Sequence, residues 1–164
     1  MPGISPVILK AHAKLNLGLR VLGVRPDGFH AIRSLFHTVT LHDSLEVSAL
    51  PVREGIRLSI SGDIPVPSGS ENIAWKAAHR FLEAVESQLG VDIHMEKRIP
   101  AAAGLGGGSS DAATVLRALR SITGQDPGIR SLAAGLGSDV PFFLKGGASL
   151  VTGRGEEIKP VSPL

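Results

Sequence analysis

Alternation of polar and apolar residues predicts strands in the first half of the chain. Residues 13–21 alternate as a half-buried strand does, which puts Lys14, Asn16 and Arg20 on one face. Residues 25–28 (Arg-Pro-Asp-Gly) predict a turn, and two further strands are expected at 35–41 and 45–49, on either side of a bend at 42–44. Segments 56–60 and 91–97 show the same alternation, so the chain is rich in strands.

Apolar residues at helical spacing predict three helices after residue 68. The first covers 73–89, follows a capping box at Ser68 to Glu71, and is closed by Gly90. The second covers 112–119 and the third 129–136, where Gly137 stops it. Strands are expected again at 140–144 and 148–152. This order indicates an α+β fold in which helices pack on an antiparallel or mixed sheet.

The composition fits one globular domain without covalent cross-links. The chain has 164 residues, of which 43% are hydrophobic and 20% charged, and it contains no Cys. A disulfide scaffold, a Cys-type zinc site and a thiol nucleophile are therefore excluded. No apolar run approaches the about 18 residues of a membrane span, and the first residues do not form a signal peptide. We expect a cytoplasmic protein with no membrane partner.

The charge pattern argues against nucleic acid as a partner. The formal net charge is only +2, although the sequence pI is about 9.3. Basic residues are scattered along the chain, and the aromatic content of 4% is too low for base-stacking platforms. A small anionic ligand suits this modest positive charge equally well.

A glycine-rich segment, residues 99–111, joins a predicted strand to a predicted helix. Glycines let the backbone approach a ligand closely, and Ser109 or Ser110 can cap the helix while its free amides face outward. Such a helix start is a site for phosphate. A flexible linker is the alternative interpretation. A Walker A loop does not fit because no Lys precedes Ser109, and a dinucleotide fingerprint does not fit because Ser109 replaces its third glycine.

Two separate features are candidates for acid–base chemistry. Asp139 lies between a helix stop and an apolar segment, where it is either a turn residue or a base that accepts a proton from a substrate hydroxyl. Lys14 and Asn16 either hold an anionic oxygen or belong to a solvated sheet face. Phe29 and His30 offer a ring for stacking beside a hydrogen-bonding imidazole. No His has metal-ligand spacing, so no protein ligand to a metal is assigned.

Together these segments resemble a known family. Residues 13–17 (Ala-Lys-Leu-Asn-Leu), 25–30 (Arg-Pro-Asp-Gly-Phe-His), 97–113 and 136–143 are similar to motifs of the 4-diphosphocytidyl-2-C-methyl-D-erythritol kinases. That family belongs to the GHMP superfamily, named for galactokinase, homoserine kinase, mevalonate kinase and phosphomevalonate kinase. The resemblance extends from about residue 10 to 160, and four motifs in the family's order make it specific.

The resemblance implies ATP-dependent phosphorylation of the 2-hydroxyl of 4-diphosphocytidyl-2-C-methyl-D-erythritol, for non-mevalonate isoprenoid synthesis, with Mg²⁺ accompanying ATP. It implies that Asp139 is the general base and Lys14 its electrostatic partner. Asn16 would help to place this small-molecule substrate, and Phe29 and His30 would hold its cytosine ring. The residues implied in ATP binding are Asn72, Lys97, Pro100, Ala101, Ala102, Ala103, Gly104, Leu105, Gly106, Gly107, Gly108, Ser109 and Ser110.

The chain departs from the family pattern in two ways. Phe29 stands where the family usually has Tyr, which keeps the stacking face and loses a hydroxyl. Family members also continue for on the order of a hundred residues as a second lobe, whereas this sequence ends at Leu164. We expect residues 1–164 to be the N-terminal, ATP-binding domain alone, with weak or absent activity, exposed apolar surface and a monomeric or weakly dimeric state.

Three other classes of function compete with this interpretation. The nearest is another small-molecule kinase of the same superfamily, for which a cytosine clamp at Phe29 and His30 would have no purpose. A lone lobe that binds nucleotide or RNA without catalysis is the second. A dinucleotide-dependent oxidoreductase is the third, and the poor fit of the glycine loop argues against it.

Overall fold

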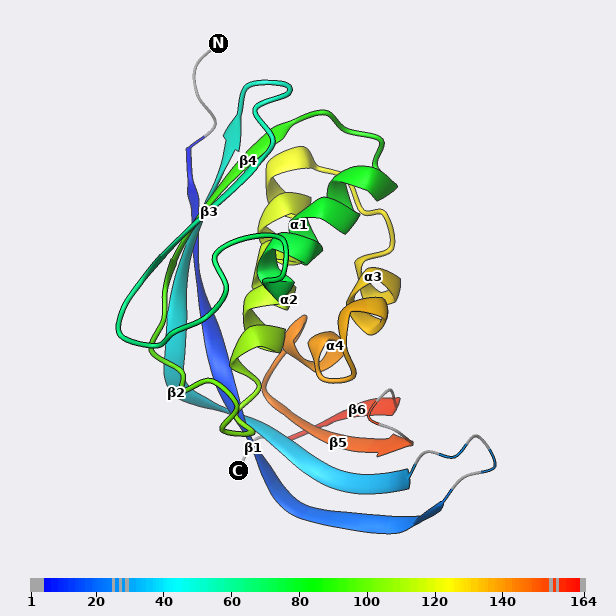
Figure 1. Ribbon diagram of the computed structural model, residues 1–164. Coiled ribbons are helices and arrows are strands. Elements are labelled where there is room, and N and C mark those ends of the chain that lie inside the picture. Colours follow the sequence, from blue (N-terminus) through cyan, green and yellow to red (C-terminus); the bar gives the residue numbers. More distant parts are fainter. Residues whose placement is uncertain are drawn as a thin grey trace.

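The computed structural model describes residues 5–24, 26, 28, 30–153, 155 and 157–162. Strands and helices alternate irregularly along this part of the chain (Figure 1). In chain order the elements are β1 (Val7–Val24), β2 (His30–Leu50), β3 (Ile56–Ser61), α1 (Ile73–Ala84), β4 (Gly90–Glu96), α2 (Gly107–Thr123), α3 (Ile129–Leu136), α4 (Val140–Phe143), β5 (Ala148–Gly153) and β6 (Glu157–Val161).

One mixed sheet forms the frame of the molecule. The long strand β2 pairs antiparallel with β1 along nearly its whole length. Residues 44–50 of β2 pair with β4, and residues 32–37 pair with β5, so β4 and β5 follow one another along the edge of β2 that β1 does not occupy. The sheet is completed by β3, parallel to β4, and by β6, antiparallel to β5. The expected α+β class and mixed sheet are confirmed.

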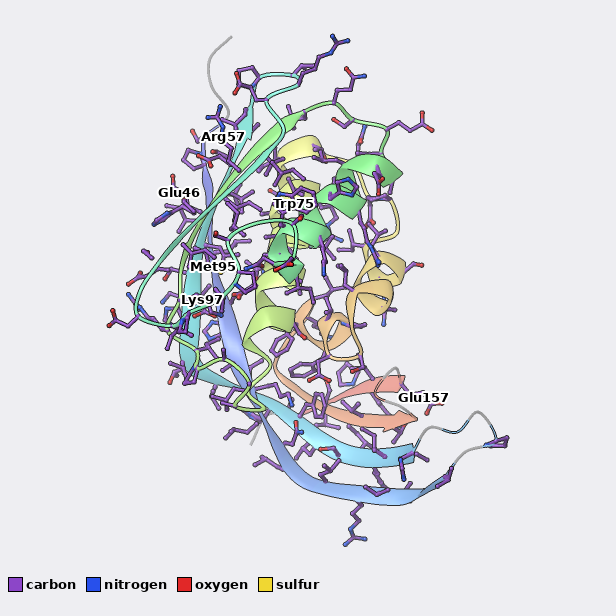
Figure 2. All side chains as sticks on the ribbon, viewed as in Figure 1. Glu46, Arg57, Trp75, Met95, Lys97 and Glu157 are labelled. Atoms are coloured by element: carbon purple, nitrogen blue, oxygen red, sulfur yellow. The ribbon has the colours of Figure 1, made fainter. Side chains whose placement is uncertain are left out.

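The helices cover one face of this sheet (Figure 1). Leu45 and Val47 on β2 and Met95 on β4 are fully buried against them, whereas Glu46 points away from the helices (Figure 2). Alanines on α1 and α2 are buried as well, and their small side chains let the two helices pack closely. The apolar core therefore lies between the sheet and the α1–α2 layer, and it supports the loop that connects β4 to α2.

The predicted bend at residues 42–44 is wrong. β2 continues through this segment without interruption, and His42, Asp43 and Ser44 are ordinary strand residues. Asp43, Leu45 and Val47 are two residues apart, so their side chains point to the same, buried face of β2. Asp43 is 0% exposed. A polar sequence suggested a turn, but the carboxylate finds buried partners that allow the strand to continue.

The first helix begins at the predicted residue, Ile73, but its cap and its end differ from the prediction. Asn72 caps α1, with its Oδ1 accepting a hydrogen bond from the Ala74 amide at 2.8 Å, so the expected capping box of Ser68 and Glu71 is not the cap. The helix ends at Ala84, and Glu86 already has a positive φ of 51°. Gly90 therefore does not close the helix. It starts β4, where a Cβ would lie 2.8 Å from the Leu50 and Glu54 side chains.

The segment 140–144, expected to be a strand, forms the short helix α4. Pro141 occupies the first turn of this helix, where its missing amide hydrogen costs nothing. Val140, Phe142 and Phe143 are buried, and the last two rings meet edge to face with centroids 5.0 Å apart. A run of apolar residues predicts burial but does not distinguish a strand from one helical turn. Strand β6 was not predicted at all.

Apolar side chains are exposed on the second half of β1, as expected for surface that something else covers. Leu19, Val21, Leu22 and Val24 are 52%, 60%, 61% and 69% exposed. This part of β1 and the start of β2 form an arm that extends beyond the helices at the bottom of Figure 1. Among the described residues, no helix combines the length and hydropathy needed to span a bilayer.

Candidate active site

The glycine-rich loop between β4 and α2 is held close to β1. Its Leu105 carbonyl accepts a hydrogen bond from the Lys14 amide at 2.9 Å. Gly106, with φ of 71°, is the N-cap of α2, so the helix starts two to three residues before the Ser109 or Ser110 cap predicted from the sequence. A Cβ at Gly106 would lie 2.8 Å from the Phe143 ring. Glycine is therefore required here both by the backbone and by the available space.

Lys14 and Asp139 meet beside this loop, although 125 positions separate them in the sequence. The Lys14 Nζ lies 3.5 Å from Asp139 Oδ2 and donates a hydrogen bond to Asn16 Oδ1 at 2.6 Å. The ammonium also lies 4.5 Å from the centroid of the Phe36 ring, within cation–π range. Lys14 is only 3% exposed, whereas the Asp139 side chain is 29% exposed, so the carboxylate is the accessible member of the pair.

An open cavity of about 580 Å³ connects these features. Its wall contains Lys14, Asn16 and Asp139, and the loop from residue 100 to 109 borders it throughout. The cavity thus gathers most of the residues that the sequence analysis proposed for catalysis and ATP binding: Lys14, Asn16, Asn72, Lys97, Pro100, Ala101, Ala102, Ala103, Gly104, Leu105, Gly106, Gly107, Gly108, Ser109 and Asp139.

Two predicted residues, Ser110 and His30, are not in the cavity wall described by the structure. Ser110 is buried in the first turn of α2, with its amide bonded to the Gly106 carbonyl at 2.9 Å. His30 is exposed at the start of β2, opposite Val24 on the arm. His30 lies eight positions before Thr38, the partner of Lys14, along the curved strand β2 (Figure 1). Phe29 lies outside the described residues.

Asn72 also lines the cavity. Its two side-chain atoms are both used locally, because Oδ1 caps α1 and Nδ2 donates to the Pro67 carbonyl at 2.7 Å. Val66, Pro67 and Glu71, which the sequence analysis did not select, share this wall. The local bonds of Asn72 fix the 66–72 segment against the cavity, so this side is preformed.

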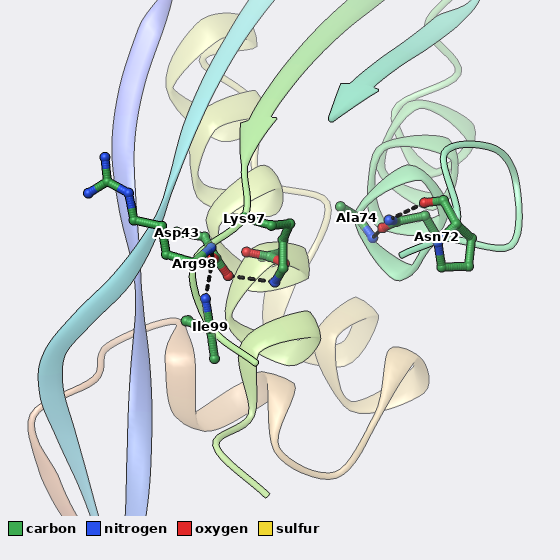
Figure 3. A network of polar contacts seen from close by, with 8 residues as sticks. Asp43, Asn72, Ala74, Lys97, Arg98 and Ile99 are labelled. Atoms are coloured by element: carbon green, nitrogen blue, oxygen red, sulfur yellow. Dashed lines mark hydrogen bonds and ion pairs between the residues drawn. The ribbon is translucent and has the colours of Figure 1, made fainter. Parts of the chain in front are cut away.

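A buried cluster of three charges lies beneath the loop (Figure 3). Lys97 Nζ is 2.6 Å from Asp43 Oδ2 and 2.9 Å from Asp111 Oδ2, and all three residues are less than 5% exposed. Burial alone would lower the pKa of Lys97, but the two carboxylates outweigh this effect and raise it. Burial is also the main reason that the pKa of Asp111 rises to about 7; the Asp43 charge adds to the rise and Lys97 opposes it.

The sequence analysis missed Asp43 as a residue of this site. The signal was present, because Asp43 shares the period-two register of Leu45 and Val47 and so had to face the core. Within the described ranges, no group of three or more His, Asp, Glu or Cys side chains is arranged to hold a metal ion.

Comparison with known proteins gives a family for this fold and cavity. Residues 72–147 match the family model "GHMP kinases N terminal domain". The 4-diphosphocytidyl-2-C-methyl-D-erythritol kinase of Moorella thermoacetica is 47% identical over 159 residues, which are 95% of this chain and 54% of the relative. The enzyme of that name from Solibacter usitatus is 44% identical over 156 residues, or 93% of this chain and 48% of the relative.

Solved structures agree with this match. A crystal structure of 4-(cytidine 5'-diphospho)-2C-methyl-D-erythritol kinase superposes with a TM-score of 0.84 at 44% identity, covering 94% of this chain and 55% of that one. The mevalonate kinase of Methanococcus jannaschii has a TM-score of 0.69 at 15% identity, covering 96% and 56%, which shows a shared fold.

The fold and the glycine loop are similar to those of the GHMP kinases, whose N-terminal domain model matches residues 72–147. Over 93–94% of its length the chain is similar to 4-diphosphocytidyl-2-C-methyl-D-erythritol kinases, as the sequence motifs implied. The chain spans about half the length of the curated relatives it matches.

Proposed function

We propose that this chain is the nucleotide-binding lobe of a kinase that phosphorylates the 2-hydroxyl of 4-diphosphocytidyl-2-C-methyl-D-erythritol with ATP. The observation that carries the proposal is that Lys14 and Asp139 lie 3.5 Å apart in the cavity bordered by the glycine loop. A phosphate bound at the loop would therefore lie close to an alcohol placed beside Asp139. Residues 1–164 form one domain in this proposal, and the exposed apolar face of β1 packs against the remainder of a protein of the relatives' length.

The loop supplies the phosphate site. Amide groups of residues 106–109 at the start of α2 have no partner within the helix, and they carry the positive end of its dipole. Gly106, Gly107 and Gly108 have no side chains in the way, so an anion can approach the backbone. ATP fits this cradle, with residues 100–110 around its phosphates and Asn72 and Lys97 on the nucleotide side.

Mg²⁺ fits the cavity as a companion of ATP. This ion commonly keeps several waters and is held by one or two protein oxygens together with nucleotide phosphates. The Ser109 hydroxyl and the Asp139 carboxylate are oxygen donors in the cavity wall that fit such an ion. When bound, the ion neutralises negative charge that develops on the transferred phosphoryl group.

Asp139 and Lys14 act on the substrate alcohol. Phosphoryl transfer depends mainly on positioning and charge neutralisation, and the hydroxyl proton leaves late, so a hydrogen-bond acceptor suffices as the base. Asp139, the accessible member of the pair, accepts that proton. Lys14 is held by Asn16 and the Phe36 ring, which keeps its charge beside the carboxylate. Asn16 places the methylerythritol end of the substrate, and Phe29 and His30 hold its cytosine.

Ligand binding tests the choice of substrate. In calorimetric titrations of the 164-residue chain, we expect ATP and 4-diphosphocytidyl-2-C-methyl-D-erythritol to bind, and mevalonate and homoserine not to bind. A chain that binds mevalonate or homoserine in preference to the cytidyl compound would belong to another GHMP kinase. A chain that binds no nucleotide would contradict the proposal as a whole.

Asp139→Asn tests the catalytic assignment. Loss of a general base typically lowers the rate by about 10² to 10⁴-fold. Binding of ATP without Mg²⁺ should stay the same or tighten, because a negative charge near the phosphates is removed. The rate is measured by phosphorus NMR under single-turnover conditions, with the protein in excess, so that slow transfer is still detected. Asp92→Asn, a change on β4 away from the cavity wall, is the control. Equal rates for the two variants would remove Asp139 from the mechanism.

A further inference from the structure

The buried charge cluster ties together the two ends of the glycine loop. At the first end, Asp43 Oδ1 accepts hydrogen bonds from the amides of Arg98 and Ile99 at 2.5 and 2.9 Å. At the other end, Asp111 lies in the second turn of α2. Lys97 joins the two carboxylates through its ammonium, and its own amide donates to the Ser61 carbonyl at 2.9 Å. Figure 3 shows Asp43 with its contacts to Lys97, Arg98 and Ile99.

The Lys97 ammonium lies directly under the first residue of α2. A Cβ at Gly107 would be 3.4 Å from Lys97 Nζ and 2.9 Å from the Ile99 side chain. Two of the three N–H groups of the ammonium are taken by buried carboxylates. Lys97 therefore cannot swing toward a phosphate as a free surface lysine would, and its charge is fixed behind the backbone amides.

Two carboxylates face one ammonium, so the cluster holds more negative charge than is needed to neutralise Lys97. Asp43 alone would pair the charge, and Asp111 Oδ1 is buried without a hydrogen-bond partner. The neighbouring Arg98 side chain does not join the cluster, because it pairs with Glu96 at 2.8 Å on the exposed side. The second carboxylate is thus poorly explained as charge balance. It is well placed to anchor α2 to the strand side of the loop.

We propose that Asp43 and Asp111 are positioning residues, which hold Lys97 beneath Gly107 and thereby keep the loop in its phosphate-binding shape before nucleotide arrives. The identity of the ligand rests on the proposed function. The positioning role is independent of the proposed function, because it concerns the shape of the loop in the unliganded chain.

Hydrogen exchange in the nucleotide-free protein tests the positioning directly. In Lys97→Met and Asp43→Asn, we expect amides of residues 98–110 to exchange about tenfold faster or more, with the centres of β2 and α1 unchanged. A general loss of stability would instead accelerate all regions together. Lys76→Met, which removes an exposed lysine of α1, is the matched control and should leave the loop unchanged. Unaltered loop exchange in the variants would overturn the proposal.

Nucleotide binding gives the second readout. The same variants should bind ATP about tenfold more weakly or worse. Asp43 lies outside the cavity wall, so Asp43→Asn should bind adenosine, which has no phosphates, with unchanged affinity. If Lys97→Met fails to fold, Asp111→Asn, which preserves side-chain shape, carries both measurements. If the wild type binds ATP and these variants bind it equally well, the positioning role is refuted and the proposed function stands. If the wild type binds no ATP, the proposed function fails, and loop exchange alone decides the positioning.

Discussion

Asp111 combines deep burial with an excess of negative charge. It is 3% exposed, and among the described residues its carboxylate pairs only with the Lys97 ammonium, which it shares with Asp43. Burial, as the main cause, raises its pKa to about 7, so the folded protein retains a proton that the unfolded chain releases near pH 4. This single carboxyl therefore makes stability depend on pH in a predictable direction.

Stability should fall with rising pH across the range in which the folded and unfolded pKa values of Asp111 differ. Between about pH 4 and pH 7 the unfolded state binds fewer protons, so the free energy of unfolding decreases by up to about 1.4 kcal/mol per pH unit from this group. Asp111→Asn lacks that dependence. In urea denaturation between about pH 5 and pH 8, we expect the variant to gain stability relative to the wild type as pH rises.

The comparison between the two proteins isolates the Asp111 contribution, because other carboxylates titrate alike in both. A stability difference that is constant across the pH range would show that Asp111 is ionised throughout. Such a result would mean that Lys97 keeps the Asp111 pKa at or below its ordinary value.

Short motifs in the sequence identified some of the site residues and missed Asp43. Lys14, Asn16 and Asp139 were selected from short motifs, and the fold brings all three to the cavity. Asp43 was taken for a bend because His-Asp-Ser resembles a turn, and local sequence does not reveal a partner such as Lys97, 54 residues away. A buried ion pair is a long-range property, so only the alternation with Leu45 hinted at it.

The glycine loop is the element on which the proposed chemistry depends most. Gly104 and Gly106 have nearly the same backbone, with φ of 73° and 71°, but different surroundings. Nothing lies within 4 Å of a Cβ at Gly104, whereas a Cβ at Gly106 would meet the Phe143 ring at 2.8 Å and the Lys14 Cγ at 3.3 Å. Comparing substitutions at these two glycines therefore distinguishes the cost of backbone strain from the cost of steric overlap.

Alanine at these two glycines should destabilise the chain to different degrees. Gly104→Ala is expected to cost about 1 to 2 kcal/mol from the left-handed backbone alone. Gly106→Ala adds about 1 to 3 kcal/mol of overpacking and displaces the Lys14 stem. Urea denaturation measures both free energies of unfolding, and ATP titration should show the larger loss for Gly106→Ala. Equal effects of the two changes would mean that Phe143 moves aside readily.

Elements with a periodic pattern were predicted well, and those set by tertiary contacts were not. Helix α3 and strand β3 match the prediction closely, because their apolar spacing is unambiguous. Helix α4 was taken for a strand, since four apolar residues have no distinguishing period. The cap of α1 was misassigned because both Ser68 and Asn72 are good caps, and the bond to Ala74 decides between them.

On the scale of the whole molecule, the exposed apolar face of β1 is the feature that the described chain leaves uncovered. Its side chains are more than half exposed from Leu19 through Val24, apart from Arg20 and Gly23. Contiguous apolar surface of this kind marks a site of contact with other protein. The overall α+β architecture could be predicted from the sequence, but the course of this arm beyond the helices could not.

Polar substitutions on this face should leave stability nearly unchanged. Leu22→Ser combined with Val24→Thr is expected to alter the free energy of unfolding by about 0.5 kcal/mol or less, while reducing fluorescence of the dye ANS, which binds exposed apolar surface. Leu45→Ala, fully buried on β2, is the contrasting variant and should cost about 2 to 5 kcal/mol. A large loss in the β1 variant would show that these side chains are packed in solution.

The central claim is that the start of α2 binds nucleotide phosphates next to Lys14 and Asp139. Titrating isotope-labelled protein with a non-hydrolysable ATP analogue, and following backbone amide shifts by NMR, tests it most directly. We predict that the largest saturable changes fall on residues 104–110, with further changes at Lys14 and Asp139. Saturation that leaves these amides unchanged, or changes confined to another part of the chain, would contradict the account.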